Sequence, residues 1–258
     1  MRIRATVAAL TGALALSALA VPAAHADEID GDTRITDVTV NGGKDVVVGT
    51  SAKKVTVSVT ATDPDGVRVA GAILWHGPRY AEADGTMLFD ENSGLRCTEV
   101  NAKTLTCRGT VLADPRTNVK KNSLAGGWKV FAYAHGEDDD MIVLDSYEKF
   151  SVKRAARLTV NASPEPVKKG KALTVAGALT RANWETRTYA GYTGQPVKLQ
   201  FKKKGASAYT TVKTVKTDAR GKLRTTVKAS ADGTFRYVFA GSSTTPAVTS
   251  AGDAVDVR

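Results

Sequence analysis

The sequence predicts an all-β protein with two consecutive β-sandwiches after a cleaved signal peptide. Three observations lead to this prediction. Val and Thr are abundant, and no long stretch has helical periodicity. Short runs of alternating apolar and polar residues recur along the chain, with turn sequences such as Asp63-Pro64-Asp65-Gly66 between them. The net charge also changes sign near residue 155, which divides the chain into two parts.

Residues 1–26 have the pattern of a secretory signal peptide. Arg2 and Arg4 precede an apolar stretch at 6–21, and Ala24-His25-Ala26 fits the small-x-small rule for cleavage. We therefore expect a mature chain that begins at Asp27 and is secreted, either released or held non-covalently on the cell wall. No later run of 18 or more apolar residues occurs, so we predict no further membrane span.

Residues 27–155 are predicted to form the first sandwich. Alternating patterns indicate strands at 35–40, 54–61, 127–134 and 141–152. Cys97 and Cys107 are the only two cysteines, and in an exported protein a close pair indicates a disulfide. The turn sequence Asn101-Ala102-Lys103 between them predicts a hairpin that places the two cysteines opposite each other. Closing so short a loop stabilises the fold by about 2.5–3 kcal/mol in the entropic model.

Residues 156–258 are predicted to form the second sandwich. Strand patterns recur at short intervals, at 157–162, 172–179, 196–203, 209–217, 222–229, 234–240 and 247–257. Turn residues at 218–221 and 231–233 separate the later ones. Seven short strands in about 100 residues is the number typical of an immunoglobulin-like sandwich.

The two predicted sandwiches carry opposite net charge. Residues 27–155 hold 16 Lys and Arg against 20 Asp and Glu, a net charge of −4. Residues 156–258 hold 18 against 6, a net charge of +12. A strongly basic domain attracts polyanions through a salt-dependent term, and anionic cell-wall polymers or polysaccharide are the candidate partners. Basic residues on sandwich strands also protect sheet edges and aid solubility, which is the alternative explanation of the same charge.

Three stretches resemble a known class of proteins. GWKVFAYAHGEDDD, and RLTVNASPEPVKKGKALTVAGALTRANW after the next strand, resemble secreted tandem immunoglobulin-like proteins of actinobacteria. PVKLQFKKKGASAYTTVKTVKTDARGKLRTTVKASADGTFRYVFAG is similar to their repeated bacterial immunoglobulin-like module. This largely uncharacterised family implies the architecture and supplies no catalytic residues. Some relatives are described as calcium-binding, which is what their acidic loops imply.

Acidic residues are expected to converge at one end of the first sandwich. In an immunoglobulin-like sandwich the B–C and F–G loops lie at the same end. The B–C loop would begin at Asp63, and the F–G loop would hold Glu137, Asp138, Asp139 and Asp140. The first strand runs antiparallel to the strand before Asp63, so the residues that precede it should lie at the same end; these are Asp27, Glu28, Asp30 and Asp32. Ca²⁺ takes six to eight oxygen ligands, and Asp63, Asp65, Asp138 and Asp140 are the candidate ligands. A solvated hairpin without a metal is the alternative, since no EF-hand loop is present.

A second candidate surface is the stretch at 181–196, expected as a long B–C loop of the second sandwich. It combines aromatic and basic residues that suit a sugar or a polyanion, namely Trp184, Tyr189, Tyr192, Arg181 and Arg187. The chain enters the second sandwich at the same end, so the alternative is that this stretch packs in the junction between the domains.

The sequence indicates a protein that is not an enzyme. The mature chain has only His76 and His135, and no G-x-S-x-G or H-E-x-x-H motif. The leading hypothesis is an exported, envelope-associated binding or structural protein with a candidate Ca²⁺ site and no other cofactor. The alternative is a polyanion- or wall-carbohydrate-binding module that acts through the basic domain. No motif for specific nucleic-acid recognition is present, and the sequence leaves the oligomeric state open.

Overall fold

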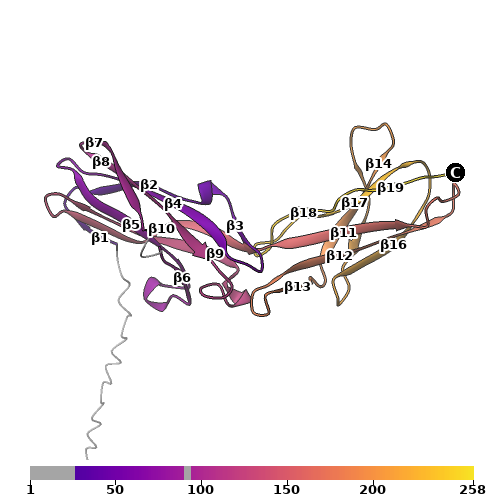
Figure 1. Ribbon diagram of the computed structural model, residues 1–258, viewed down its shortest axis with the longest axis horizontal. Coiled ribbons are helices and arrows are strands. Elements are labelled where there is room, and N and C mark those ends of the chain that lie inside the picture. The colour runs from indigo at the N-terminus through magenta and orange to yellow at the C-terminus, as the bar shows by residue number, and fades with distance from the viewer. Residues whose placement is uncertain (1–26, 90–93) are drawn as a thin grey trace, which may run out of the picture.

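The computed structural model describes residues 27–89 and 94–258 and confirms the all-β, immunoglobulin-like fold. The expected signal peptide, residues 1–26, lies outside the described residues. Two β-sandwiches follow each other along the long axis of the molecule (Figure 1). The described helical segments are three single 3₁₀ turns, η1 (Asn41–Gly43), η2 (Tyr80–Glu82) and η3 (Asn122–Leu124). Within the described ranges, no helix has the length and apolarity needed to span a bilayer.

The first sandwich consists of two sheets. One has the order β1-β10-β9-β5-β6, with β3 paired parallel to β10; its strands are β1 (Glu28–Asp30), β3 (Val46–Val48), β5 (Val67–His76), β6 (Gly85–Met87), β9 (Gly126–Gly136) and β10 (Met141–Arg154). The other has the order β2-β4-β8-β7, formed by β2 (Arg34–Val40), β4 (Lys53–Thr62), β7 (Arg96–Asn101) and β8 (Thr104–Ala113). In immunoglobulin terms, the sheet β2-β4-β8-β7 has the order A-B-E-D, and β10-β9-β5 has the order G-F-C. The expected B–C loop therefore follows β4, and the expected F–G loop follows β9.

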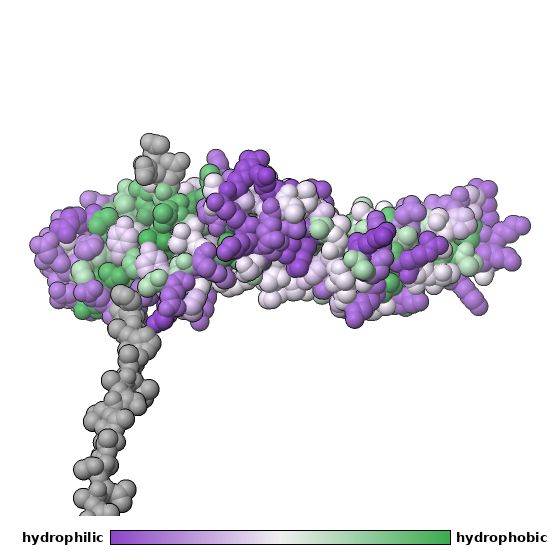
Figure 2. Space-filling view, turned by 90° about the horizontal axis from the view of Figure 1, so that it is seen from below, coloured by the Kyte–Doolittle hydropathy of each residue, from purple (hydrophilic) through white to green (hydrophobic). Residues whose placement is uncertain are grey.

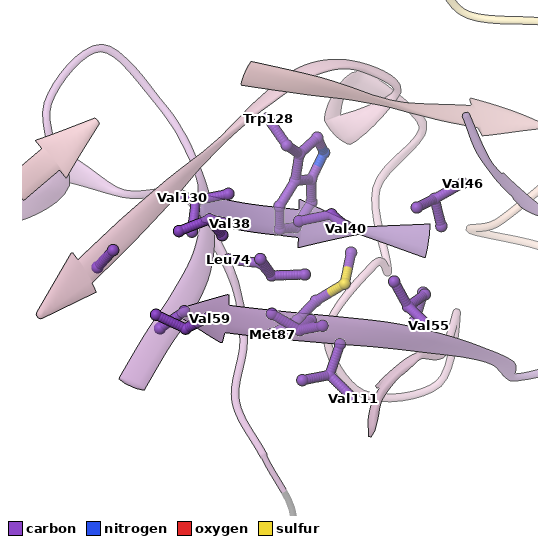
Figure 3. Packing of buried hydrophobic residues seen from close by; sticks show 14 of the residues in the cluster. Val38, Val40, Val46, Val55, Val59, Leu74, Met87, Val111, Trp128 and Val130 are labelled. Carbon is purple, nitrogen blue, oxygen red and sulfur yellow. The ribbon is translucent and has the colours of Figure 1, made fainter. Parts of the chain in front are cut away.

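Alternation along the strands builds the core between the two sheets. On β4, Val55, Val57 and Val59 are buried while the residues between them face outward. On β9, Trp128 and Val130 follow the same period of two. Figure 3 shows Val55 and Val59 of one sheet facing Trp128 and Val130 of the other, with Leu74 and Met87 between them.

The second sandwich also consists of two sheets. The first contains β11 (Ala156–Ser163), β12 (Ala172–Asn183), β13 (Thr188–Gly191) and β16 (Lys222–Lys228). The second contains β14 (Pro196–Lys203), β15 (Thr210–Lys216), β17 (Gly233–Phe239), β18 (Val248–Thr249) and β19 (Asp253–Val255). No described sheet contains strands from both sides of Ala155, since β10 ends at Arg154 and β11 begins at Ala156.

Two elements of the second sandwich differ from the expectations. The stretch expected as a long B–C loop is largely a hairpin, because β12 extends to Asn183 and β13 pairs back along it in the register Asn183↔Thr188. The last expected strand, 247–257, is interrupted between β18 and β19. In both places the local alternation is short, and pairing with β12 or β17 decided where regular hydrogen bonding begins and ends.

Candidate functional sites

The loop between β4 and β5 is built around the buried carboxylate of Asp63. This residue directly follows β4, and its backbone N–H donates to Lys103 O at 3.0 Å. The N–H of Asp65 donates to Asp63 Oδ1 at 2.8 Å, and Gly66 N–H donates to Asp63 O at 3.3 Å. The Asp63 side chain is enclosed by this turn and is only 2% exposed. A buried carboxylate requires compensation by hydrogen bonds or by a cation.

The β9–β10 hairpin lies against this loop. Glu137 N–H donates to Gly66 O at 2.9 Å, which joins the two loops, and Gly136 N–H closes the hairpin on Asp140 O at 2.8 Å. Asp138 Oδ1 accepts from the N–H of Asp140 at 3.3 Å. The hairpin thus holds Asp138 beside Asp63, as the expected F–G loop required.

The segment before β2 completes the cluster. Thr33 donates its hydroxyl to Asp63 Oδ2 at 2.5 Å, and the N–H of Asp32 donates to Asp140 Oδ2 at 2.6 Å. Carboxylates of two loops therefore bind the N-terminal segment. Carboxylate oxygens of Asp32, Asp63 and Asp138 all lie within 4.8 Å of one another. We call these three residues the carboxylate triad.

The triad has no basic partner among the ion pairs of the described residues. Arg68 pairs instead with Asp139 at 3.0 Å, and Arg34 donates to the carbonyls of Gly31 and Thr33. Desolvation, and then the carboxylates of Asp63, Asp140, Asp138 and Asp65, raise the pKa of Asp32. The cluster is thus electrostatically unfavourable as an assembly of acids alone.

Two glycines allow this close approach of carboxylates. A Cβ at Gly136 would lie 2.6 Å from both Asp138 Oδ1 and Asp63 Oδ2, which is too close for any side chain. At Gly31, where φ is +76°, a Cβ would collide with the Asp140 carboxylate. The absence of side chains at these positions leaves room for the carboxylates of three segments.

The predicted ligands are distributed unevenly around the triad. Asp63 and Asp138 belong to it, while Asp140 holds the N–H of Asp32 and Asp65 lies in the turn that surrounds Asp63. Asp32 was missing from the predicted ligand set. Its place follows from the pairing of Arg34 with Thr62, which brings the residues before β2 next to those after β4. The signal in the sequence was the position of Asp32 shortly before the first strand, which was expected to run antiparallel to the strand that ends near Asp63.

Asp27 and Glu28 do not join the acidic cluster, contrary to expectation. β1 pairs antiparallel with β10 in the register Asp30↔Met141 and Glu28↔Val143. Asp30 therefore lies beside the start of β10, next to the hairpin, and Glu28 and Asp27 lie farther from the hairpin. Asp27 Oδ1 accepts from the N–H of Asp145 at 3.2 Å. The cluster nevertheless lies far from the second sandwich, because β10 runs for 14 residues from the hairpin to the junction, about 45 Å. This hydrophilic end is at the left in Figures 1 and 2.

The aromatic stretch at 181–196 lies at the junction of the sandwiches. Trp184 is fully buried in the core cluster of the first sandwich, and its indole N–H donates to Val48 O at 3.3 Å. Its backbone N–H donates to Asn122 Oδ1 at 3.0 Å. The interpretation of Trp184 as an exposed platform for sugars is therefore wrong, and the junction alternative describes its position.

The other residues of this stretch surround the junction. Arg157 lies 3.7 Å from the ring of Tyr189, and Arg181 lies 3.9 Å from the ring of Tyr192. Tyr189, Arg181 and Tyr192 are partly buried, whereas Arg157 is exposed, and so is Arg187 in the turn between β12 and β13. The other four predicted binding residues thus share no surface with Trp184, which is fully buried.

A buried arginine links the chain segments at the junction. Arg154 is 7% exposed, and its Nε donates to Ala182 O at 2.6 Å. Burial, followed by the charge of Arg181, lowers its pKa to about 10. Backbone bonds from Ala155 N–H to Val48 O and from Ala182 N–H to Ala155 O, each 2.8 Å, complete the contact.

The cysteines form the predicted disulfide. Cys97 on β7 and Cys107 on β8 are direct cross-strand partners, with Cα atoms 3.9 Å apart. Cys107 is buried in the core of the first sandwich. Structural disulfides are typical of proteins that fold in oxidising compartments.

No protein-family model matches the sequence, and no curated protein matches it either. Several solved structures are similar over most of this chain. PorU of Porphyromonas gingivalis has 14% identity, coverage of 87% of this chain and 20% of PorU, and a TM-score of 0.30. The adhesin InvE of Yersinia pseudotuberculosis has 13% identity and a TM-score of 0.29, and the match covers 86% of this chain and 58% of InvE. The Escherichia coli adhesin FdeC has 18% identity and a TM-score of 0.29, and the match covers 88% of this chain and 66% of FdeC.

The chain thus spans 20% of PorU and 58% of InvE. At 18% identity or less and TM-scores of 0.30 or less, these similarities say nothing about the function of this chain.

Proposed function

We propose that this protein is a non-enzymatic, exported binding or structural module whose first sandwich binds Ca²⁺ at the carboxylate triad. The observation that carries the proposal is the convergence of Asp32, Asp63 and Asp138 from three separate segments, with Asp63 buried and no basic partner among the described ion pairs. Ca²⁺ prefers oxygen ligands in adaptable loops, and carbonyls and water would complete its six to eight ligands.

The proposed role of the ion is to hold the end of the first sandwich together. The triad joins the segment before β2, the β4–β5 loop and the β9–β10 hairpin, which repel one another when all three acids are charged. Binding of Ca²⁺ only to the folded state stabilises that state by mass action. An ordered loop end of an immunoglobulin-like sandwich is a suitable place for contact with another molecule.

Calorimetric titration and thermal melting test this proposal. We expect heat of Ca²⁺ binding and a higher melting temperature in millimolar Ca²⁺ than in chelator, with a smaller response to Mg²⁺, which demands a stricter octahedral site. Asp63→Asn and Asp138→Asn should remove both responses. Asp139→Asn is the matched control: it removes one charge from the same hairpin, and Asn tolerates the φ of +70° at that position. No binding heat and an unchanged melting temperature in wild type would refute the proposal.

A second candidate function is polyanion binding through the second sandwich. Its net charge of +12 and its many exposed Lys and Arg residues favour this function, as does its separation from the acidic end of the first sandwich. Sedimentation with purified cell walls would test it. We expect retention at low ionic strength and release in about 0.5 M salt, because screening weakens exposed charge contacts.

A further inference from the structure

The outer face of the sheet β15-β14-β17 carries an ordered row of basic side chains. On β14, Val197 and Leu199 are buried, so Lys198, Gln200 and Lys202 point away from the core. On the neighbouring strand β17, Arg236 lies between the buried residues Phe235 and Tyr237 and faces the same side.

Arg236 is held in place by two neighbours, Gln200 and Tyr209. It is the cross-strand partner of Gln200, and its Nε donates to Gln200 Oε1 at 2.9 Å. Gln200 in turn donates its amide to Thr211 Oγ1 at 3.5 Å, which orients its oxygen toward the arginine. The guanidinium carbon lies 3.7 Å from the centre of the Tyr209 ring, and Lys202 Nζ lies 5.1 Å from the same ring. Stacking and hydrogen bonding together fix the plane of the guanidinium group.

The terminal nitrogens of Arg236 remain available to a ligand. Among the described residues, no acceptor takes a hydrogen bond from Nη1 or Nη2, and neither Lys198, Lys202 nor Arg236 is in an ion pair. Two carboxylates of the same sandwich are engaged elsewhere, Asp232 with Lys204 and Asp253 with the N–H of Ala162. An arginine fork with its plane already fixed is well suited to bidentate contact with a phosphate.

The spacing of the cations is regular. Lys198, the Gln200–Arg236 pair and Lys202 occupy successive outward positions on β14, about 7 Å apart. An extended polymer with one anionic group per short repeat can contact all three positions. A glycan with one carboxylate per disaccharide spaces its charges more widely. The one aromatic ring on this face, Tyr209, is already stacked on Arg236, so no open ring is offered to a nucleic-acid base.

We propose that this row, formed by Lys198, Lys202, Arg236 and Tyr209, binds a linear polyol-phosphate polymer. The proposal rests on the second candidate function, polyanion binding by the basic sandwich, and names its site and ligand class. Phosphates of successive repeats contact Lys198, Arg236 and Lys202, with Arg236 making the bidentate contact at the centre.

Binding of fluorescent poly(glycerol phosphate) to the full-length mature protein tests the site. We expect Arg236→Gln to weaken binding about 10-fold, because the central fork is lost. The matched control is Arg224→Gln on β16 of the opposite sheet, which removes the same charge and should change the affinity less than about 2-fold. Tyr209→Phe should retain binding, whereas Tyr209→Leu should weaken it because the stack on Arg236 is lost.

The salt dependence gives an independent measurement. The slope of log affinity against log salt should become less steep by about one unit in Arg236→Gln and remain unchanged in Arg224→Gln. Equal effects of the two substitutions would overturn the site while leaving polyanion binding intact. Equal wild-type affinity for hyaluronate or single-stranded DNA would overturn the ligand class. No wild-type binding to any of these polymers would refute the second candidate function as well.

Discussion

Trp184, which follows the second strand of the second sandwich, donates its indole N–H to the carbonyl of Val48 in the first sandwich. Its side chain is counted among the buried core residues of the first sandwich, together with Ala182. One domain therefore supplies part of the other domain's core. This arrangement predicts that the two sandwiches do not unfold independently.

Trp184→Ala should destabilise the first sandwich by about 3–5 kcal/mol, because a large buried side chain is lost and a cavity remains. In calorimetry, we expect the melting transition of the first sandwich to move to lower temperature and to separate from that of the second. Small-angle scattering should show a broader range of interdomain arrangements. Trp184→Phe is the control, since it keeps most of the burial and loses mainly the hydrogen bond, at about 1 kcal/mol. An unshifted first transition in Trp184→Ala would contradict the coupling.

Gly136→Ala should impair the carboxylate triad without removing a carboxylate. The new Cβ would lie 2.6 Å from oxygens of Asp138 and Asp63, so these groups must move apart. We expect Ca²⁺ affinity to fall at least about 10-fold, or about 1.4 kcal/mol. Gly127→Ala on the same strand is the control, because nothing lies within 4 Å of its added Cβ. Titration calorimetry measures both, and equal Ca²⁺ affinity of the two variants would argue against the triad as the site.

The response to Ca²⁺ should depend on pH through Asp32. Its pKa in the folded, Ca²⁺-free protein is raised by desolvation and by the surrounding carboxylates. Protonation therefore favours the folded state: this contribution is complete below the unfolded pKa and is lost as the pH rises through the folded pKa. Ca²⁺ competes with that proton, so its stabilising effect should shrink as the pH falls through the same range.

Melting curves in Ca²⁺ and in chelator, recorded from pH 7 down to about pH 4, measure this dependence. In Asp32→Asn the part of the pH dependence that comes from Asp32 should disappear. A Ca²⁺-induced shift that grows toward acidic pH would contradict the assignment.

Replacing both Cys97 and Cys107 with alanine should lower the free energy of unfolding of the first sandwich by about 2.5–3 kcal/mol. The reason is that the unfolded chain regains the conformational entropy that the disulfide removes by closing this loop. Urea unfolding of the variant, compared with wild type with and without reductant, measures the loss. The second sandwich serves as an internal reference. Its unfolding should shift less than that of the first sandwich, because both cysteines lie on β7 and β8 of the first sandwich and only the shared junction couples the two. A loss confined to the second transition would be inconsistent with this structure.

Much of the architecture follows from local sequence. Alternation of apolar and polar residues indicated β4, β9 and β14, because a period of two already determines which side chains share a face. Turn residues indicated that Cys97 and Cys107 face each other across a hairpin, and the charge of each half could be counted directly. The meeting of Asp63 with Asp138 followed from the loop positions of an immunoglobulin-like sandwich.

The sequence by itself thus determined the fold class, the division of charge and those strands with a clear alternation, all of which depend on local pattern and composition. Tertiary structure decided which residues meet. Strand register placed Asp32 in the triad and led Asp27 away along β10. Packing between the domains buried Trp184 in the core of the first sandwich, where its indole N–H meets the carbonyl of Val48, 136 residues earlier in the sequence. Pairing of β14 with β17 ordered Arg236 on Gln200 and Tyr209. Contacts between segments distant in sequence depend on register and domain packing, which no local period specifies.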